Sequence, residues 1–126
     1  MAIVEVCSSN LLLLQTSHEK SGARYYVALK DCPPVYFQRP AVDVLFQSVS
    51  RNSGKYAICV LLSGMGSNGA RGLLEIRRTG AYTLAQDEES CVVYGMPRAA
   101  IDLDAAECVA PLSDITPRIF NHLHIR

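Results

Sequence analysis

The residues best able to do chemistry lie in a glycine-rich segment in the middle of the chain. Gly64, Gly66 and Gly69 follow a G-x-G-x-x-G spacing after an apolar run, and Asp87 comes about 20 residues later. Such a turn can bind a pyrophosphate on its backbone N–H groups, while the acid binds ribose hydroxyls. A strand that turns directly into a helix also needs glycine. The motif alone therefore leaves open a nucleotide site and a structural turn with a polar Asn68 inside it.

The other nucleophiles and bases are scattered along the chain. The five cysteines form no CxxC pair, and the three histidines lie near the two ends of the sequence. This distribution favours reduced thiols in a cytoplasmic protein and argues against a disulfide scaffold or a zinc site. We therefore expect no metal and no cofactor. The histidines, which we expect to be exposed and solvated, are His18, His122 and His124.

Composition narrows the classes of function. The 126 residues carry twelve basic and twelve acidic side chains, so the net charge is zero, which argues against a nucleic-acid binder held by phosphate contacts. No apolar run reaches the roughly 20 residues of a membrane helix, and no signal-peptide pattern is present. We expect one domain over residues 1–126, in the cytoplasm, with no membrane insertion.

The elements that must position the glycine turn alternate between strand and helix. The first thirty residues predict a hairpin of 11–15 with 25–29, plus an extended piece at 2–6. The predicted elements that follow are a helix from Pro40, a strand at 56–62, a helix at 70–78, a strand at 81–85, a helical turn at 91–94, a helix at 95–103, a strand at 107–110 and a helix from Ser113 or Asp114. Strands separated by helices imply right-handed crossovers and a parallel sheet. The fold class is therefore α/β, a doubly wound, mostly parallel sheet with helices on both faces and an N-terminal antiparallel hairpin.

Three segments of the sequence, residues 39–46 (RPAVDVLF), 62–72 (LSGMGSNGARG) and 85–100 (AQDEESCVVYGMPRAA), resemble the catalytic domain of CheB, in the same order and with the same spacing. CheB is the chemotaxis protein-glutamate methylesterase and glutamine deamidase. The resemblance implies a doubly wound α/β fold and hydrolysis by a Ser-His-Asp triad. It also implies that the Met65 amide helps to bind the oxyanion, and that Cys91 is a packing residue.

The same resemblance shows what this sequence lacks. The family's triad serine lies in a Gly-Ala-Ser-Thr-Gly-Gly-type turn and its histidine in a Gln-His-Met-Pro-type segment, and neither occurs here. The triad acid lies in a Gly-Met-Gly-x-Asp-Gly turn, where this chain has Asn68. Without a nucleophile and its base there is no acyl transfer. We therefore expect a truncated, CheB-like chain without catalytic activity that acts as a binding or oligomerising module.

Two alternatives remain for the function, and one further expectation concerns assembly. A second chain could supply serine and histidine and give a working methylesterase or deamidase, or the turn at Gly64, Gly66 and Gly69 could bind a nucleotide together with Asp87. Loss of the family's first strands would leave the strand at 56–62 with an unpaired edge, which another copy, another protein or residues 2–15 could cover. We expect a homodimer or another protein partner, with chemoreceptor helices as a further candidate.

Overall fold

The computed structural model contains a parallel sheet of four strands in the order β1-β4-β5-β6. The strands are β1 (Ala2–Val4), β4 (Ala57–Leu61), β5 (Tyr82–Gln86) and β6 (Cys108–Ala110). This confirms the predicted α/β fold with parallel strands. The structure describes residues 2–4, 11–19, 22–30 and 42–125, with no side chains described before residue 42 or after residue 123.

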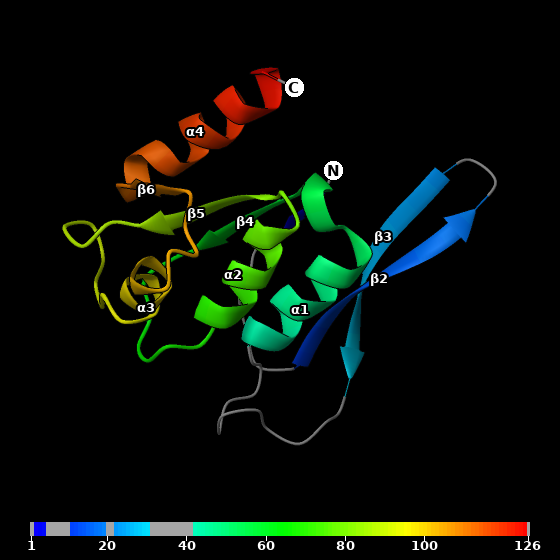
Figure 1. Ribbon diagram of the computed structural model, residues 1–126, viewed down its shortest axis with the longest axis horizontal. Helices are drawn as coiled ribbons and strands as arrows, with labels where there is room; N and C mark the ends of the chain where they lie inside the picture. Colours follow the sequence, from blue (N-terminus) through cyan, green and yellow to red (C-terminus); the bar gives the residue numbers. More distant parts are fainter. Residues whose placement is uncertain (1, 5–10, 20–21, 31–41, 126) are drawn as a thin grey trace.

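Helices cover both faces of the sheet (Figure 1). Three of them, α1 (Val42–Asn52), α2 (Ala70–Arg78) and α3 (Met96–Asp102), pack on one face, and α4 (Leu112–Ile125) packs on the other. Among the described residues, no helix is both long enough and apolar enough to cross a membrane.

The core forms two layers because side chains on a strand alternate between faces. From β4, Ala57, Cys59 and Leu61 point toward the layer of α1, α2 and α3, while Ile58 points toward α4. The first layer is filled by the apolar stripes of the helices, which include Leu45, Phe46, Val49, Leu73, Ile76 and Ala100. The second layer joins Ile58, Leu84 and Ala110 to Ile115 of α4.

A separate antiparallel hairpin lies beside α1, away from the parallel sheet (Figure 1). Its strands, β2 (Leu11–Glu19) and β3 (Gly22–Lys30), pair from Leu11 with Lys30 to Glu19 with Gly22, and β2 contacts α1. Both strands are longer than the segments that the sequence pattern indicated. His18, expected in a turn, is a strand residue opposite Ala23.

The expected open edge of the strand at 56–62 is not present. That strand is β4, and β1 pairs with it in parallel, from Ala2 with Ala57 to Val4 with Cys59. The N-terminal segment therefore covers this edge, which is one of the three possibilities that the sequence left open. The strand is also shorter than expected, because Tyr56 belongs to a short 3-10 helix, η1 (Gly54–Tyr56), and is exposed.

Two local predictions near the C-terminal half are wrong. Residues 91–94 form no helical turn, because Tyr94 forms a bridge with Gly64 instead. The sequence pattern placed Phe120 on the inward face of the last helix together with Ile115, Ile119 and Leu123, but Phe120 is 56 % exposed and does not face inward. The inward stripe of α4 consists of Ile115, Ile119 and Leu123 at intervals of four, which turns the neighbouring Phe120 toward solvent. The helix also begins at Leu112, earlier than the predicted start at Ser113 or Asp114. The predicted helix start at Pro40 and the two cysteines Cys7 and Cys32 lie outside the described residues.

Candidate functional site

The glycine turn between β4 and α2 is fastened to the loop that follows β5. The Gly64 N–H donates to the Val93 carbonyl at 3.0 Å, and the Gly64 carbonyl accepts from the Gly95 and Met96 N–H groups at 3.1 and 2.8 Å. Both loops leave the carboxyl edge of neighbouring parallel strands. The candidate site therefore lies where ligands commonly bind in open α/β sheets.

Close packing explains two of the glycines. A Cβ on Gly95 would lie 2.8 Å from the Gly64 carbonyl oxygen and 2.9 Å from the Gly66 nitrogen, so no side chain fits between the loops. Gly69 has φ +96°, and a Cβ there would lie 2.9 Å from Leu61. Gly95 in the facing loop therefore needs to be glycine for packing, and Gly69 in the turn for packing and backbone conformation, independently of any nucleotide.

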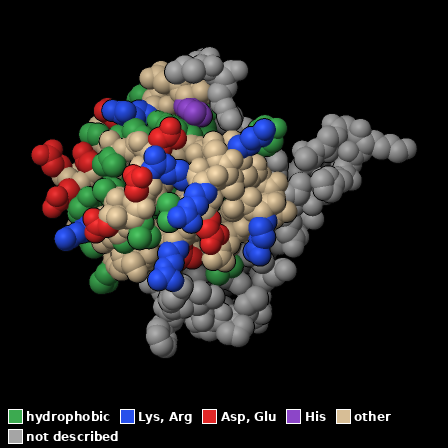
Figure 2. Space-filling view, viewed as in Figure 1, with side chains coloured by type: hydrophobic (Ala, Val, Ile, Leu, Met, Phe, Trp, Pro, Cys, Tyr) green, Lys and Arg blue, Asp and Glu red, His purple; other side chains and the backbone are tan. Residues whose placement is uncertain are grey.

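Asp87 is occupied within its own loop. Its Oδ1 accepts from the Ser90 N–H at 3.0 Å and from the Ser90 hydroxyl at 2.6 Å. Acidic side chains gather at one margin of the face in Figure 2, where Figure 1 places the loop after β5, and Glu88 and Glu89 in this loop are exposed. Asp87 thus stabilises the loop, and the nucleotide-binding alternative stays a prediction.

Gln86 is a structural link that sequence patterns did not reveal. Its buried side chain accepts from the Ser63 N–H at 2.8 Å and donates to the Ser90 carbonyl at 2.8 Å. Ser63 in turn accepts from the Val93 N–H at 2.9 Å. The loops after β4 and β5 are therefore joined by side-chain bonds as well as backbone bonds.

Asn68 lies buried in the glycine turn, with 7 % of its surface exposed. Its Oδ1 accepts from the Asp43 N–H at 3.0 Å. A backbone N–H can only donate, so the amide oxygen must face it and the NH₂ group points the other way. The position thus holds a neutral amide in a fixed orientation.

Asp43 connects the beginnings of α1 and α2. It is 5 % exposed, and its Oδ1 accepts from the Gly72 N–H at 2.8 Å. A Cβ on Gly72 would lie 2.6 Å from the Phe46 Cβ, which shows how closely the two helices approach. Sequence reasoning missed Asp43 as a site residue. The available signal was an acid in the first turn of an amphipathic helix, three positions before the core residue Phe46.

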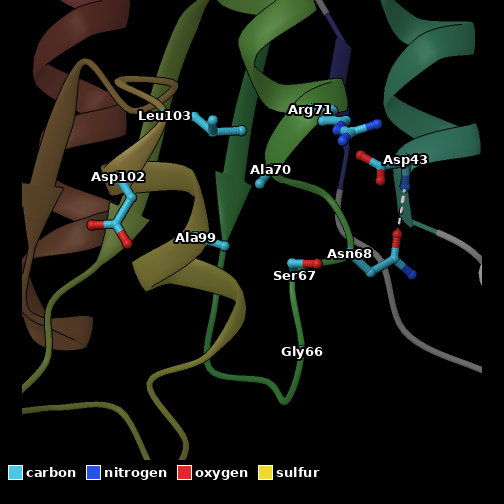
Figure 3. A pocket seen from close by; sticks show the side chains of 9 residues that line it. All are labelled: Asp43, Gly66, Ser67, Asn68, Ala70, Arg71, Ala99, Asp102 and Leu103. Carbon is cyan, nitrogen blue, oxygen red and sulfur yellow. Dashed lines mark hydrogen bonds between the residues drawn. The ribbon is translucent and has the colours of Figure 1, made fainter.

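A pocket of about 520 Å³ opens between α1, α2 and α3. Asp43, Asn68 and Arg71 lie on one side of it, and Ala99, Asp102 and Leu103 on the other (Figure 3). The lining is completed by Gly66, Ser67 and Ala70. The pocket therefore brings Asn68 together with two carboxylates and a guanidinium, and no histidine is among the described residues that line it.

The other candidate nucleophiles and bases lie elsewhere. His122, expected to be solvated, is half-buried and stacks on Tyr82 with ring centroids 4.1 Å apart. Burial raises the pKa of the Cys59 thiol to about 12. The pKa of Cys91 is also raised, first by burial and then by the charge of Asp87, which disfavours a reactive thiolate. No group of three or more potential metal ligands occurs among the described residues.

The Met65 side chain points into solvent and is 77 % exposed. Val92, in the adjoining loop, is 93 % exposed, and Val93 is also exposed. These three residues form what we call the apolar rim of the carboxyl edge. The role of the Met65 amide stays a prediction.

A family model described as CheB methylesterase matches residues 4–119 of the sequence. The chain belongs to the CheB methylesterase family. The CheB resemblance stated from the sequence is thereby confirmed, and it covers almost all of the described residues.

Curated CheB relatives share high identity with the chain over part of their length. The protein-glutamate methylesterase/protein-glutamine glutaminase 1 of Burkholderia pseudomallei is 56% identical over 104 residues, which are 82% of this chain and 29% of that protein. The corresponding Chromohalobacter salexigens protein is 58% identical over 96 residues, 76% of this chain and 27% of that protein. The chain therefore spans under a third of the length of these CheB relatives.

A solved CheB structure confirms the fold. The catalytic domain of Thermotoga maritima CheB methylesterase matches with a TM-score of 0.74 and 27% identity, over 87% of this chain and 57% of that one. The parallel sheet and its covering helices are therefore those of the CheB catalytic domain.

Proposed function

We propose that this CheB-family chain, taken by itself, does not hydrolyse methyl esters and acts as a binding or oligomerising module. The observation that carries the proposal is Asn68. The resemblance gives this position to the triad acid, and here a neutral amide is held by the Asp43 N–H at 3.0 Å. Among the described residues that line the pocket beside it, none is a histidine or a cysteine.

The chemistry explains why an amide is a poor substitute. The triad acid holds the histidine in the productive tautomer and stabilises the imidazolium that forms during the reaction. An asparagine carries no charge and stabilises the wrong tautomer, which costs about 10⁴ in rate in the serine-protease example of this substitution. Asn68 alone would therefore reduce turnover strongly.

Binding is the function that remains, and the apolar rim supports it. Met65, Val92 and Val93 project from two loops that are fastened together, so they form a surface on a rigid support. Exposed apolar groups of this kind are typical of protein–protein contacts. The partner we propose is a second copy of the chain or another protein, with chemoreceptor helices as a further candidate.

The test is a hydrolysis assay on methylated chemoreceptor, with released methanol as the readout. The chain alone should give no turnover above a buffer blank, whereas the Thermotoga maritima catalytic domain serves as the positive control. Clear turnover by the chain alone would overturn the proposal.

A second candidate is a methylesterase or deamidase that receives serine and histidine from another chain. The open pocket at Asn68 and the high identity to proteins named as methylesterases favour keeping this alternative. It predicts turnover only when the chain is mixed with a CheB fragment that carries the serine and histidine motifs, and more turnover with Asn68→Asp. Absence of turnover in both mixtures, with the original chain and with Asn68→Asp, would exclude this alternative.

A further inference from the structure

Charged side chains of both signs adjoin the apolar rim. Glu88 and Glu89 precede Val92 in the loop after β5, and Arg98 follows it in the first turn of α3. All three charged side chains are exposed, and neither glutamate forms an ion pair with another described residue. In Figure 2 acidic, basic and hydrophobic side chains follow one another along one margin of the face, where Figure 1 places this loop and α3. The rim therefore has acidic and basic neighbours on one surface.

The bonds that support the rim also fix the backbone that carries these charges. The Gly64 carbonyl accepts from two N–H groups at the start of α3, which fixes the backbone of Arg98 relative to the glycine turn. In the loop after β5, the Cys91 N–H donates to the Glu88 carbonyl at 3.3 Å and closes the turn that carries both glutamates. The charges are therefore held in a constant position relative to the rim.

Tyr94 is close to both kinds of charge. Its ring is half-buried in the same loop, and its backbone forms the bridge with Gly64. Burial raises the pKa of the phenol first, the charges of Glu88 and Asp102 raise it further, and the charge of Arg98 lowers it. Carboxylates and a guanidinium therefore act on one ring, as expected if they share a small surface.

A surface of this kind is complementary to a copy of itself. A two-fold axis between the acidic and basic side chains sets the acid of each copy against the base of the other, because residue i then meets residue j at both contacts. Complementary charges also fix the register of an interface and disfavour wrong partners. The chain has no net charge, so no long-range repulsion opposes the approach of two copies.

We propose that the apolar rim is the interface of a two-fold homodimer, in which Arg98 of each copy pairs with Glu88 and Glu89 of the other. This inference rests on the proposed binding function and commits it to one occupant, a second copy of the chain. Arg98 is available for this contact, since it approaches Asp102 only at 4.0 Å and both side chains are largely exposed. Exposed pairs of this kind contribute little to stability, so the guanidinium can change partner at small cost.

The experiment is sedimentation velocity over a range of micromolar concentrations, with circular dichroism to show that each variant is folded. The original chain should dimerise. Arg98→Glu and the double variant Glu88→Lys/Glu89→Lys should each weaken the dimer by about 10-fold or more, because like charges then meet twice across the axis. The matched control is Arg78→Glu, at an exposed position in the last turn of α2, which alters the net charge as Arg98→Glu does and should leave the dimer intact.

An equimolar mixture of the two weakened variants gives the decisive measurement. In the mixed dimer the charges have opposite signs at both contacts, so the mixture should dimerise about as tightly as the original chain. A general effect of charge on solubility or folding would not produce this rescue. A monomer at all concentrations, an unweakened dimer in Arg98→Glu, or a mixture no tighter than its components would overturn the inference.

The methanol assay separates this inference from the proposed function. A monomeric chain that releases no methanol would overturn the homodimer and leave the proposed function in place, with a different protein as the partner. Methanol release by a chain whose variants show the expected rescue would overturn the absence of hydrolysis and leave the homodimer in place.

Discussion

At the scale of single residues, the site is defined by an amide in the place of an acid. The Asn68 Oδ1 accepts from the backbone N–H of Asp43, and the Asp43 carboxylate in turn accepts from the Gly72 N–H. The two side chains therefore fix the turn and the beginnings of α1 and α2 together. Substitutions here act on stability and on the pocket at once, and controls on exposed neighbours separate the two effects.

Asn68→Ala should destabilise the chain by about 1–3 kcal/mol, because the buried Asp43 N–H loses its acceptor. Urea unfolding followed by circular dichroism measures the change. Ser67→Ala, at the exposed neighbouring position, is the control and should stay within about 0.5 kcal/mol. Equal midpoints for Asn68→Ala and the original chain would contradict the role given to this bond.

Cys59 should make stability fall at alkaline pH. Its folded pKa is about 12 against an ordinary value of 9.0, because burial disfavours the thiolate. Below pH 9 both states keep the proton and stability does not change. Between pH 9 and 12 the unfolded chain releases the proton while the folded chain retains it, so unfolding becomes easier. Urea midpoints from pH 8 to 11 should decline less steeply in Cys59→Ala, and an unchanged slope would argue against this cause.

At the scale of elements, the carboxyl edge depends on the junction between two loops. The Gly64 carbonyl accepts from both Gly95 and Met96, and Gln86 links Ser63 to Ser90. The N-terminus of α3 is thereby set against the glycine turn. The junction leaves no room for a side chain at Gly95.

Gly95→Ala should destabilise the chain by about 1–3 kcal/mol, since its Cβ would overlap the Gly64 carbonyl. The comparison is Gly66→Ala, where φ is +88° but nothing lies within 4 Å of the added Cβ, so that backbone strain of about 1–2 kcal/mol acts alone. Amide exchange at Met96 separates the two, because only Gly95→Ala should release the junction. Protection at Met96 that survives in Gly95→Ala would refute the argument.

The sequence predicted elements where local patterns decide them. Helix α2 has the predicted bounds Ala70–Arg78, and Gly80 after it has φ +97°. It could not predict the extended path of residues 91–94, because that path is set by bonds to Gly64 across the chain. For the same reason the roles of Asp43 and Gln86 were missed. Both are long-range bonds from buried polar side chains, which periodicity does not encode.

At the scale of the whole molecule, β1 changes the expectation for assembly. The open edge that motivated a homodimer is covered, since Ala2–Val4 pairs with β4. The apolar rim of Met65, Val92 and Val93 remains exposed and becomes the surface through which we expect partners to bind. We therefore expect association through the apolar rim at the carboxyl end of the sheet and not through the edge of β4.

Sedimentation velocity at micromolar concentration should show a dimer, and Val92→Asp should shift it toward monomer, because a charge at the centre of an apolar contact must be desolvated. Leu112→Asp, at another exposed apolar position, is the control and should leave the dimer intact. A monomer at all concentrations would contradict self-association and would leave a different protein as the proposed partner.

The double acceptor role of the Gly64 carbonyl has a mechanical consequence. Since one oxygen anchors the first turn of α3, a molecule that displaces the glycine turn must also tilt that helix or break two bonds together. Deuterium uptake at the Gly95 and Met96 amides should then rise together. These two amides would therefore report when a bound molecule displaces the glycine turn.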